Sequence, residues 1–195
     1  MYKSFNCLKI GLISFVSLTT LNITHGQTTN VELPKAKQTT LGLYVTAKEA
    51  YEKWMGNPEK VKILDVRTPE EYMFIGHAAI AWNIPLLFQT YIWDEEKGHF
   101  SMKPNTDFMS HIKDVFQPDD IILVTCRSGG RSAMAVNQLA AAGFTNVYNI
   151  TDGFEGDKVK DPNSVFNGFR MVNGWKNSGA TWTDKVDPKQ MRLPK

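Results

Sequence analysis

The residues whose types and spacing suggest chemistry lie in one short loop. They are Cys126, Arg127, Ser128, Gly129, Gly130, Arg131 and Ser132. An apolar run at residues 121–125 precedes the cysteine, and helix formers at 133–142 follow the loop. This order places a thiol at the end of a buried strand and at a helix N-terminus, where backbone N–H groups and the helix dipole attract an anion. With two arginines beside it, such a cysteine is expected to ionise readily and to act as a nucleophile.

The first 26 residues have the layout of a secretory signal peptide. Lys3 and Lys9 form a basic start, residues 10–21 are mostly apolar, and small residues precede a plausible cut ahead of Gln27. The apolar run is too short to span a bilayer, which takes roughly 20 residues. The other interpretations are a membrane anchor or a disordered tail. We therefore expect a periplasmic or secreted protein with no membrane attachment after cleavage.

Charge and cysteine content narrow the function further. The formal net charge of +2 disappears when Lys3 and Lys9 are removed, so nothing favours nucleic acid or an anionic membrane as a partner. Removal of Cys7 leaves Cys126 alone, which makes an internal disulfide impossible. The thiol is then either an inert core residue or a reactive group, and its Arg- and Gly-rich setting favours the second. Cysteines and histidines lack the spacing of metal ligands, so we expect no metal.

The elements that must position this loop alternate along the chain. Residues 27–42 are polar and predict a flexible leader. Capping-box pairs at Thr46 with Glu49 and at Thr68 with Glu71 each open a helix. These two helices are predicted to end near Gly56 and Gly76, and further helices to span 107–116 and 132–142. Strands are predicted at 61–66, 79–84, 121–125 and 147–150. Residues 86–106 are predicted to be less regular.

Strands that alternate with helices at this spacing predict a parallel sheet with helices on both faces. In such sheets the ligand lies beyond the carboxyl ends of the strands, which is where Cys126 falls. Asp65 and Arg67 come at the end of another predicted strand. We therefore expect them to share this rim.

Three groups of residues, taken together, resemble a known family. They are Leu64 to Tyr72 with Gly76-His77-Ala78 and Asn83-Ile84-Pro85; Thr125 to Ser132; and Gly143-Phe144, Val147-Tyr148 and Asp152-Gly153-Phe154. In this order and spacing they resemble the rhodanese-like, single-domain sulfurtransferases, from about Val45 to Trp182. The resemblance implies a three-layer α/β/α sandwich with a five-stranded parallel sheet over residues 43–185, followed by a C-terminal tail at 186–195.

The resemblance also implies a reaction. Sulfane sulfur would pass from a small anionic donor such as thiosulfate to a thiol or carrier-protein acceptor through a persulfide on Cys126, the catalytic residue. Residues 127–132 would bind the substrate: loop amides near 128–132 would stabilise the anionic sulfur, Arg127 would hold the donor, and Arg131 would brace the loop. Asp65 and Arg67 would support the loop as an ion pair. No cofactor is required.

Other functions use the same loop. One is a persulfide carrier that serves a partner protein without turnover. Another is a phosphatase or arsenate reductase, although related phosphatases have a loop one residue longer than the six residues from Cys126 to Arg131. An internal dithiol cycle needs a second cysteine and is excluded.

Residues outside the loop are expected to have structural roles. His77 follows a predicted helix end and is expected to be packed rather than to act as a base. The aromatic residues are expected to pack in the core, with some at the mouth of the pocket; they are Tyr91, Trp93, Phe100, Trp175 and Trp182. Segments 86–106 and 157–172 are longer than a minimal rhodanese requires and are candidates to border the pocket.

Overall fold

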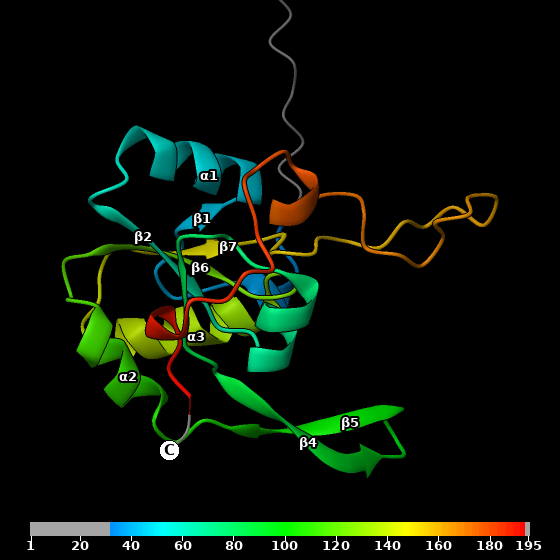
Figure 1. The fold of residues 1–195 in the computed structure, drawn as a ribbon, viewed down its shortest axis with the longest axis horizontal. Helices are drawn as coiled ribbons and strands as arrows, with labels where there is room; N and C mark the ends of the chain where they lie inside the picture. The colour runs from blue at the N-terminus through cyan, green and yellow to red at the C-terminus, as the bar shows by residue number, and fades with distance from the viewer. Residues whose placement is uncertain (1–31, 194–195) are drawn as a thin grey trace, which may run out of the picture. The chain divides into compact units, whose positions relative to one another are not determined.

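Five parallel strands form the sheet that carries the Cys126 loop (Figure 1). The computed structural model describes residues 32–193, so the predicted signal peptide and residues 27–31 lie outside the described residues. The strands are β1 (Tyr44–Val45), β2 (Val61–Asp65), β3 (Ala81–Asn83), β6 (Ile121–Thr125) and β7 (Val147–Ile150). Their order in the sheet is β1-β7-β6-β2-β3, and every pairing is parallel.

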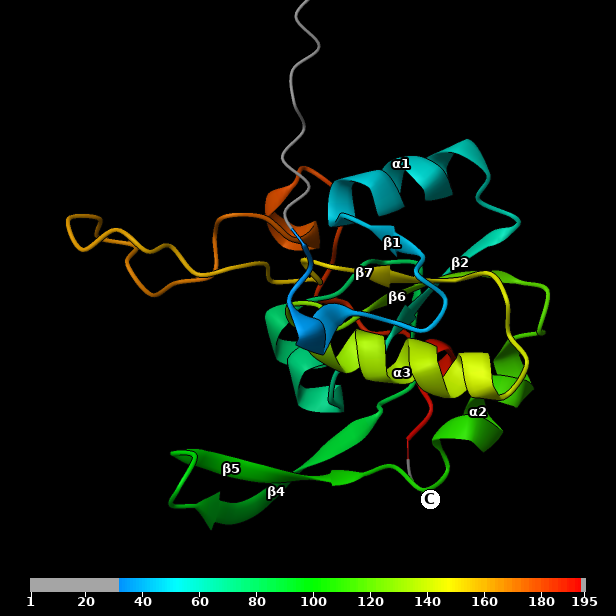
Figure 2. The ribbon, with the colours of Figure 1, turned by 180° about the vertical axis from the view of Figure 1, so that it is seen from behind.

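Helices cover both faces of this sheet, as Figures 1 and 2 show. Helix α1 (Ala47–Gly56) packs on one face with Trp175 and Phe154. Helices α2 (Phe108–Val115) and α3 (Gly130–Ala141) pack on the other. Buried strands with apolar residues on both sides require such double cover. The predicted three-layer α/β/α architecture with a five-stranded parallel sheet is therefore confirmed.

Both predicted capping boxes form. Thr46 N donates to Glu49 Oε2 (2.7 Å) and Glu49 N to Thr46 Oγ1 (3.3 Å), which opens α1. Thr68 and Glu71 make the same reciprocal pair. The second helix then widens into a π-helical turn, η2 (Glu71–Ile75), and ends before Gly76, whose φ is 95°. π-Helical turns of this kind are frequent at functional sites.

The segment 86–106 is a β-hairpin, so the prediction of an irregular segment was wrong. Strands β4 (Leu87–Asp94) and β5 (His99–Pro104) form a separate two-stranded antiparallel sheet whose register shifts between Gln89 and Trp93. The physical reason is visible in the sequence, because residues 90–93 are β-branched or aromatic and Gly98 closes a turn after acidic residues. The hairpin projects away from the main sheet (Figure 2).

The packed domain is wider than the predicted 43–185. In the described part of the predicted leader, η1 (Lys35–Lys37) contacts α3, and Thr40 N donates to Asn137 Oδ1 (2.9 Å). In the predicted C-terminal tail, Arg192 N donates to Asn83 O (2.9 Å). Both flanking segments are therefore held against the domain at these points. No helix within residues 32–193 is long and apolar enough to cross a membrane.

Two tryptophans offer a matched test of the core. Trp175 is 1% exposed, packs edge-on against Tyr51, and donates its Nε1 proton to Thr181 O. Trp93, on the hairpin, is 47% exposed. We expect Trp175→Ala to lower the free energy of unfolding by about 3–5 kcal/mol. Trp93→Ala should cost within roughly 1 kcal/mol. Urea denaturation measures both, and equal losses would contradict this account of the core.

Candidate active site

Cys126 follows β6 directly and lies beneath the loop that leads into α3. Its Sγ accepts hydrogen bonds from Gly129 N (3.2 Å) and Ser132 Oγ (3.4 Å), and its side chain is 1% exposed. Gly129 has a φ of 98° where the loop turns into α3, a backbone conformation that favours glycine. The amides near residues 128–132 were expected to face the sulfur. Among the described contacts, the Gly129 amide donates to it. The sulfur thus has a backbone donor, a hydroxyl donor and a helix N-terminus around it.

Asn149, in β7, holds this loop from below. Its Oδ1 lies 2.6 Å from Ser132 Oγ, whose one proton is shared between this oxygen and Cys126 Sγ. Its Nδ2 donates to Gly129 O (3.2 Å) and Lys37 O (2.9 Å). The side chain is fully buried. One amide therefore fixes both residues that donate to the sulfur. This role of Asn149 was not predicted; the available signal in the sequence was a polar side chain inside a predicted buried strand.

The chain after β7 passes close under the loop. Phe154 N donates to Cys126 O (2.7 Å), and Glu155 N donates to Arg127 O (3.0 Å). Gly153 allows this approach, because a Cβ there would lie 2.6 Å from Cys126 O and from Ser128 N. Main-chain hydrogen bonds from the segment after β7 thus hold the backbone of Cys126 and Arg127 in place.

Arg131 is tied to Glu71 by two hydrogen bonds of 2.6 Å each. Burial alone would raise the pKa of Glu71, but the hydrogen bonds and charge of Arg131, with the Thr68 amide, outweigh burial and lower it. Arg131 thus joins the loop to η2, consistent with the expected bracing role. Glu71 was expected only as a capping residue, and its second partner could not be inferred from spacing.

Asp65 and Arg67 form the ion pair that the sequence suggested. Arg67 Nη2 lies 2.6 Å from Asp65 Oδ2, and both side chains are completely buried. Arg67 also donates to Gly76 O (2.7 Å), and its guanidinium lies over the Phe154 ring. The contacts of this pair join β2, the residue after η2 and the chain under the loop. Its place is structural rather than in contact with the sulfur.

His77 is a packed residue, in line with the prediction. It is buried and stacked on Tyr72 with ring centroids 3.6 Å apart, and its Nδ1 lies 3.0 Å from Tyr72 O. Burial lowers its pKa, which favours the neutral ring. Residues 32–193 contain no cluster of His, Cys, Asp or Glu that could hold a metal ion.

Arg127 and Arg131 line one side of an open pocket of about 600 Å³, and residues of the hairpin line its other side. Trp93 and Phe100 contribute an edge-to-face aromatic pair to its wall, with centroids 5.2 Å apart. Arg127 is exposed and makes no side-chain hydrogen bond or ion pair among the described residues. Segment 86–106 therefore borders a pocket at the loop, whereas Trp175 packs in the core.

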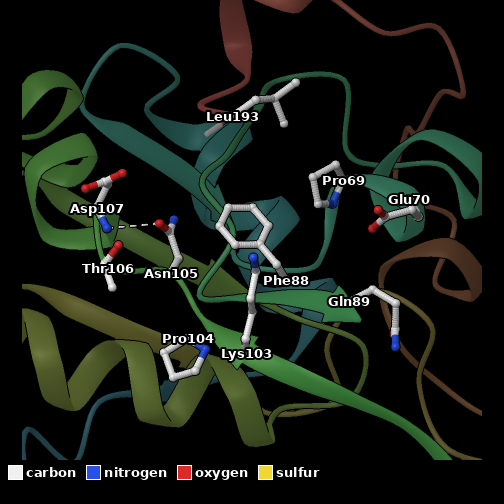
Figure 3. Close-up of a pocket in the computed structure, with 10 residues that line it drawn as sticks. All are labelled: Pro69, Glu70, Phe88, Gln89, Lys103, Pro104, Asn105, Thr106, Asp107 and Leu193. Atoms are coloured by element: carbon white, nitrogen blue, oxygen red, sulfur yellow. Dashed lines mark hydrogen bonds between the residues drawn. The ribbon is translucent and has the colours of Figure 1, made fainter. Parts of the chain in front are cut away.

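A second pocket of about 580 Å³ lies at the base of the hairpin (Figure 3). Phe88 and Lys103 lie at its centre, and Asp107 N donates to Asn105 Oδ1 on one side. No cysteine or histidine is among the residues that line it. Segment 157–172 borders neither pocket, and Asp157 N donates to Asn173 Oδ1 (2.7 Å) where this segment leaves and rejoins the domain. The candidate site is therefore the Cys126 loop.

A cysteine at the carboxyl end of a central parallel strand, followed by a glycine-rich loop and a helix N-terminus, defines a class of three-layer α/β proteins. Within that class the sequence model of the rhodanese-like domain matches residues 46–160. This match covers more than half of the chain, so the chain belongs to the rhodanese-like domain family. The resemblance predicted from the sequence is confirmed.

Individual relatives agree with this family. The chain is 41% identical over 93 residues to "Thiosulfate sulfurtransferase 16, chloroplastic" of Arabidopsis thaliana, covering 48% of this chain and 70% of that protein. It is 30% identical over 138 residues to "Uncharacterized protein RP600 homolog" of Rickettsia rickettsii, covering 71% and 94%. The crystal structure of Rv0390 from M. tuberculosis superposes with a TM-score of 0.56 at 26% identity, covering 72% and 96%.

Two glycines with the same backbone angle test the close approach under the loop. Gly153 has a φ of 66° and close neighbours, whereas Gly42 has a φ of 64° and no heavy atom within 4 Å of an added Cβ. We expect Gly42→Ala to cost about 1–2 kcal/mol for the left-handed backbone alone. Gly153→Ala should cost clearly more, because the methyl group collides with the loop backbone. Chemical denaturation compares the two, and similar losses would argue against the close approach.

The Glu71–Arg131 pair predicts a pH-dependent stability. The pKa of Glu71 is lowered in the folded protein, so its ionised form stabilises the fold above the unfolded pKa, about 4.3, and this contribution is lost as the pH falls through the folded pKa. We expect Glu71→Gln to lower the free energy of unfolding by about 1–3 kcal/mol at neutral pH. The difference from the unmodified chain should shrink steadily toward acidic pH.

Denaturation curves collected across this pH range provide the measurement. Glu70→Gln is the matched control, because Glu70 is the exposed neighbour of Glu71 in the same turn. A loss that is independent of pH, or an equal loss in the control, would contradict the role assigned to the pair.

Proposed function

We propose that this protein is a sulfurtransferase that moves sulfane sulfur from a donor such as thiosulfate to a thiophilic acceptor through a persulfide on Cys126. The observation that carries the proposal is the environment of Sγ, which receives the Gly129 amide and the Ser132 hydroxyl at the N-terminus of α3. Donors of this kind stabilise an anionic sulfur. Family membership and the sulfurtransferase relative support the same reaction.

In the first step the Cys126 thiolate attacks the outer sulfur of thiosulfate. A bond forms between Sγ and that sulfur, and the sulfur–sulfur bond of the donor breaks with its electron pair leaving on sulfite. Arg127, exposed and unpaired among the described residues, faces the pocket and suits the anionic end of the donor. Arg131, held by Glu71, supports the loop during this step.

In the second step an acceptor thiolate attacks the outer sulfur of the persulfide. The bond to Cys126 Sγ breaks, the thiolate is restored, and the acceptor leaves as a persulfide. No cofactor enters either step. We propose a small thiol or a carrier protein as acceptor, in a periplasmic or extracellular setting, on the basis of the signal-like layout of residues 1–26.

Two alternatives use the same thiol. A persulfide carrier would accept one sulfur without turnover. A phosphatase or arsenate reductase would use the thiol against an oxyanion; one relative, 32% identical over 117 residues and covering 56% of this chain and 64% of that protein, is named "Protein HIGH ARSENIC CONTENT 1, mitochondrial" of Arabidopsis thaliana. The nearly covered Cys126 sulfur favours the addition of a single sulfur atom over that of a tetrahedral oxyanion.

Mass spectrometry of the protein after incubation with thiosulfate tests the proposal. We expect a gain of one sulfur atom on Cys126, followed by release of thiocyanate when cyanide is added, with repeated turnover. Cys126→Ser should lose both signals, because the hydroxyl does not form a persulfide.

The outcomes separate the alternatives. A single burst of thiocyanate without turnover would support the carrier, and arsenate reduction without sulfur loading would support the reductase. The sulfurtransferase proposal fails if Cys126 gains no sulfur.

A further inference from the structure

The chain that precedes β1 runs directly beside the Cys126 loop. Its short helix η1 contacts α3 (Figure 2). A Cβ added at Gly129 would lie 3.1 Å from Lys37 Cδ, and a Cβ added at Gly130 would lie 3.8 Å from Ala36 O. Both neighbours come before residue 46, where the match to the rhodanese-like domain begins. A segment outside the matched residues therefore lies against both glycines of the loop.

One hydrogen bond joins this segment to the support of the loop. Asn149 has a fully buried side chain, and its Nδ2 carries two protons. One proton is donated to Gly129 O (3.2 Å) and the other to Lys37 O (2.9 Å). Without Lys37 O a buried donor would lack its acceptor, which costs free energy and favours a turn of the amide away from Gly129. The ion pair of Lys37 with the half-exposed Asp157 spans 3.9 Å and adds little, so the main-chain contact is the link that matters.

Polar contacts, rather than core packing, hold the segment in place. None of residues 32–40 is buried. Thr39 N donates to Tyr44 Oη (2.8 Å), and Thr40 N donates to Asn137 Oδ1 (2.9 Å). Tyr44 lies in β1 and Asn137 in the second half of α3, so neither acceptor belongs to the site loop. Removal of these two acceptors should therefore release the segment without opening the core.

We propose that residues 34–40 are part of the active site and that Lys37 is a positioning residue for the Cys126 loop. With the segment in place, Asn149 holds Gly129 by its carbonyl, while the N–H of the same residue donates to the Cys126 sulfur. When the segment leaves, the amide loses an acceptor and the loop loses this support. The segment acts on the surroundings of the thiol, so the inference goes beyond the proposed sulfur transfer.

Release of the segment in the full chain tests the inference. Tyr44→Phe with Asn137→Ala removes both acceptors and leaves every residue of the loop unchanged. We expect the Gly129 amide to exchange with solvent deuterium roughly tenfold faster in this variant, because the loop opens more often.

Single-turnover loading of Cys126 by thiosulfate gives the second measurement. We expect the loading rate constant at saturating thiosulfate to fall by roughly tenfold in the release variant, because the sulfur is less well placed for attack. The thiosulfate concentration that gives half of this rate should change by less than about twofold, because Arg127 is still present to bind the donor.

Two further variants serve as rescue and control. Tyr44→Phe with Asn137→Asp keeps an Oδ1 acceptor for Thr40 N and should recover most of both losses. Tyr148→Phe with Gln138→Ala makes similar changes on β7 and α3, at side chains with no described hydrogen bond to residues 34–40. This control should behave as the unmodified chain.

The outcomes decide the inference in each case. Gly129 exchange and a loading rate equal to those of the control would overturn it, even if the release variant is less stable, because the segment would then serve stability alone. Faster exchange with an unchanged loading rate would also overturn it. If Cys126 of the unmodified chain takes up no sulfur, the proposed function fails, and the exchange of Gly129 alone decides whether the segment positions the loop.

Discussion

The geometry of the site depends on the direction in which one peptide group points. Gly129 adopts a positive φ where the loop enters α3, and its N–H donates to the Cys126 sulfur at 3.2 Å. The turn also brings the backbone close to the strand below, since a Cβ at Gly129 would lie 2.2 Å from Thr151 O. Glycine is therefore required both for the angle and for the space. Asn149 then fixes the carbonyl of the same residue.

Around this peptide, charge is arranged in pairs. Asp65 with Arg67 and Glu71 with Arg131 place two carboxylates and two guanidinium groups near one buried thiol. Buried charges are tolerated only when they are paired and hydrogen-bonded. Arg131 is held by Glu71, whereas Arg127 makes no side-chain hydrogen bond or close ion pair among the described residues and interacts with the charge of Glu155. Arg67 and Arg131 therefore support the loop, and Arg127 is available to contact a ligand.

Much of this arrangement could be predicted from the sequence. The alternation of strands and helices gave the parallel sheet, and the order of strand, cysteine, glycine-rich loop and helix gave the position of the nucleophile. Both capping boxes were visible as Thr and Glu three residues apart. These features are local, so spacing along the chain is enough to reveal them.

The remaining features depend on contacts between residues far apart in the chain. Glu71 meets Arg131 and Asn149 meets Ser132 only after the sheet has formed, and no local pattern encodes either contact. The hairpin was missed for another reason. Its first strand has β-branched and aromatic residues at 90–93 but no strict apolar–polar alternation, which is the signal used to recognise a half-buried strand. The register also shifts between Gln89 and Trp93.

The hydrogen bonds across the base of segment 157–172 affect how the length of this segment can vary. Asp157 and Asn173 join the two ends of the segment, so the domain core is complete without what lies between them. The entropy of closing such a loop rises only with the logarithm of its length. Insertions or deletions between Asp157 and Asn173 should therefore change the free energy of unfolding little. We expect related proteins to differ in length here, and an inserted domain to be tolerated.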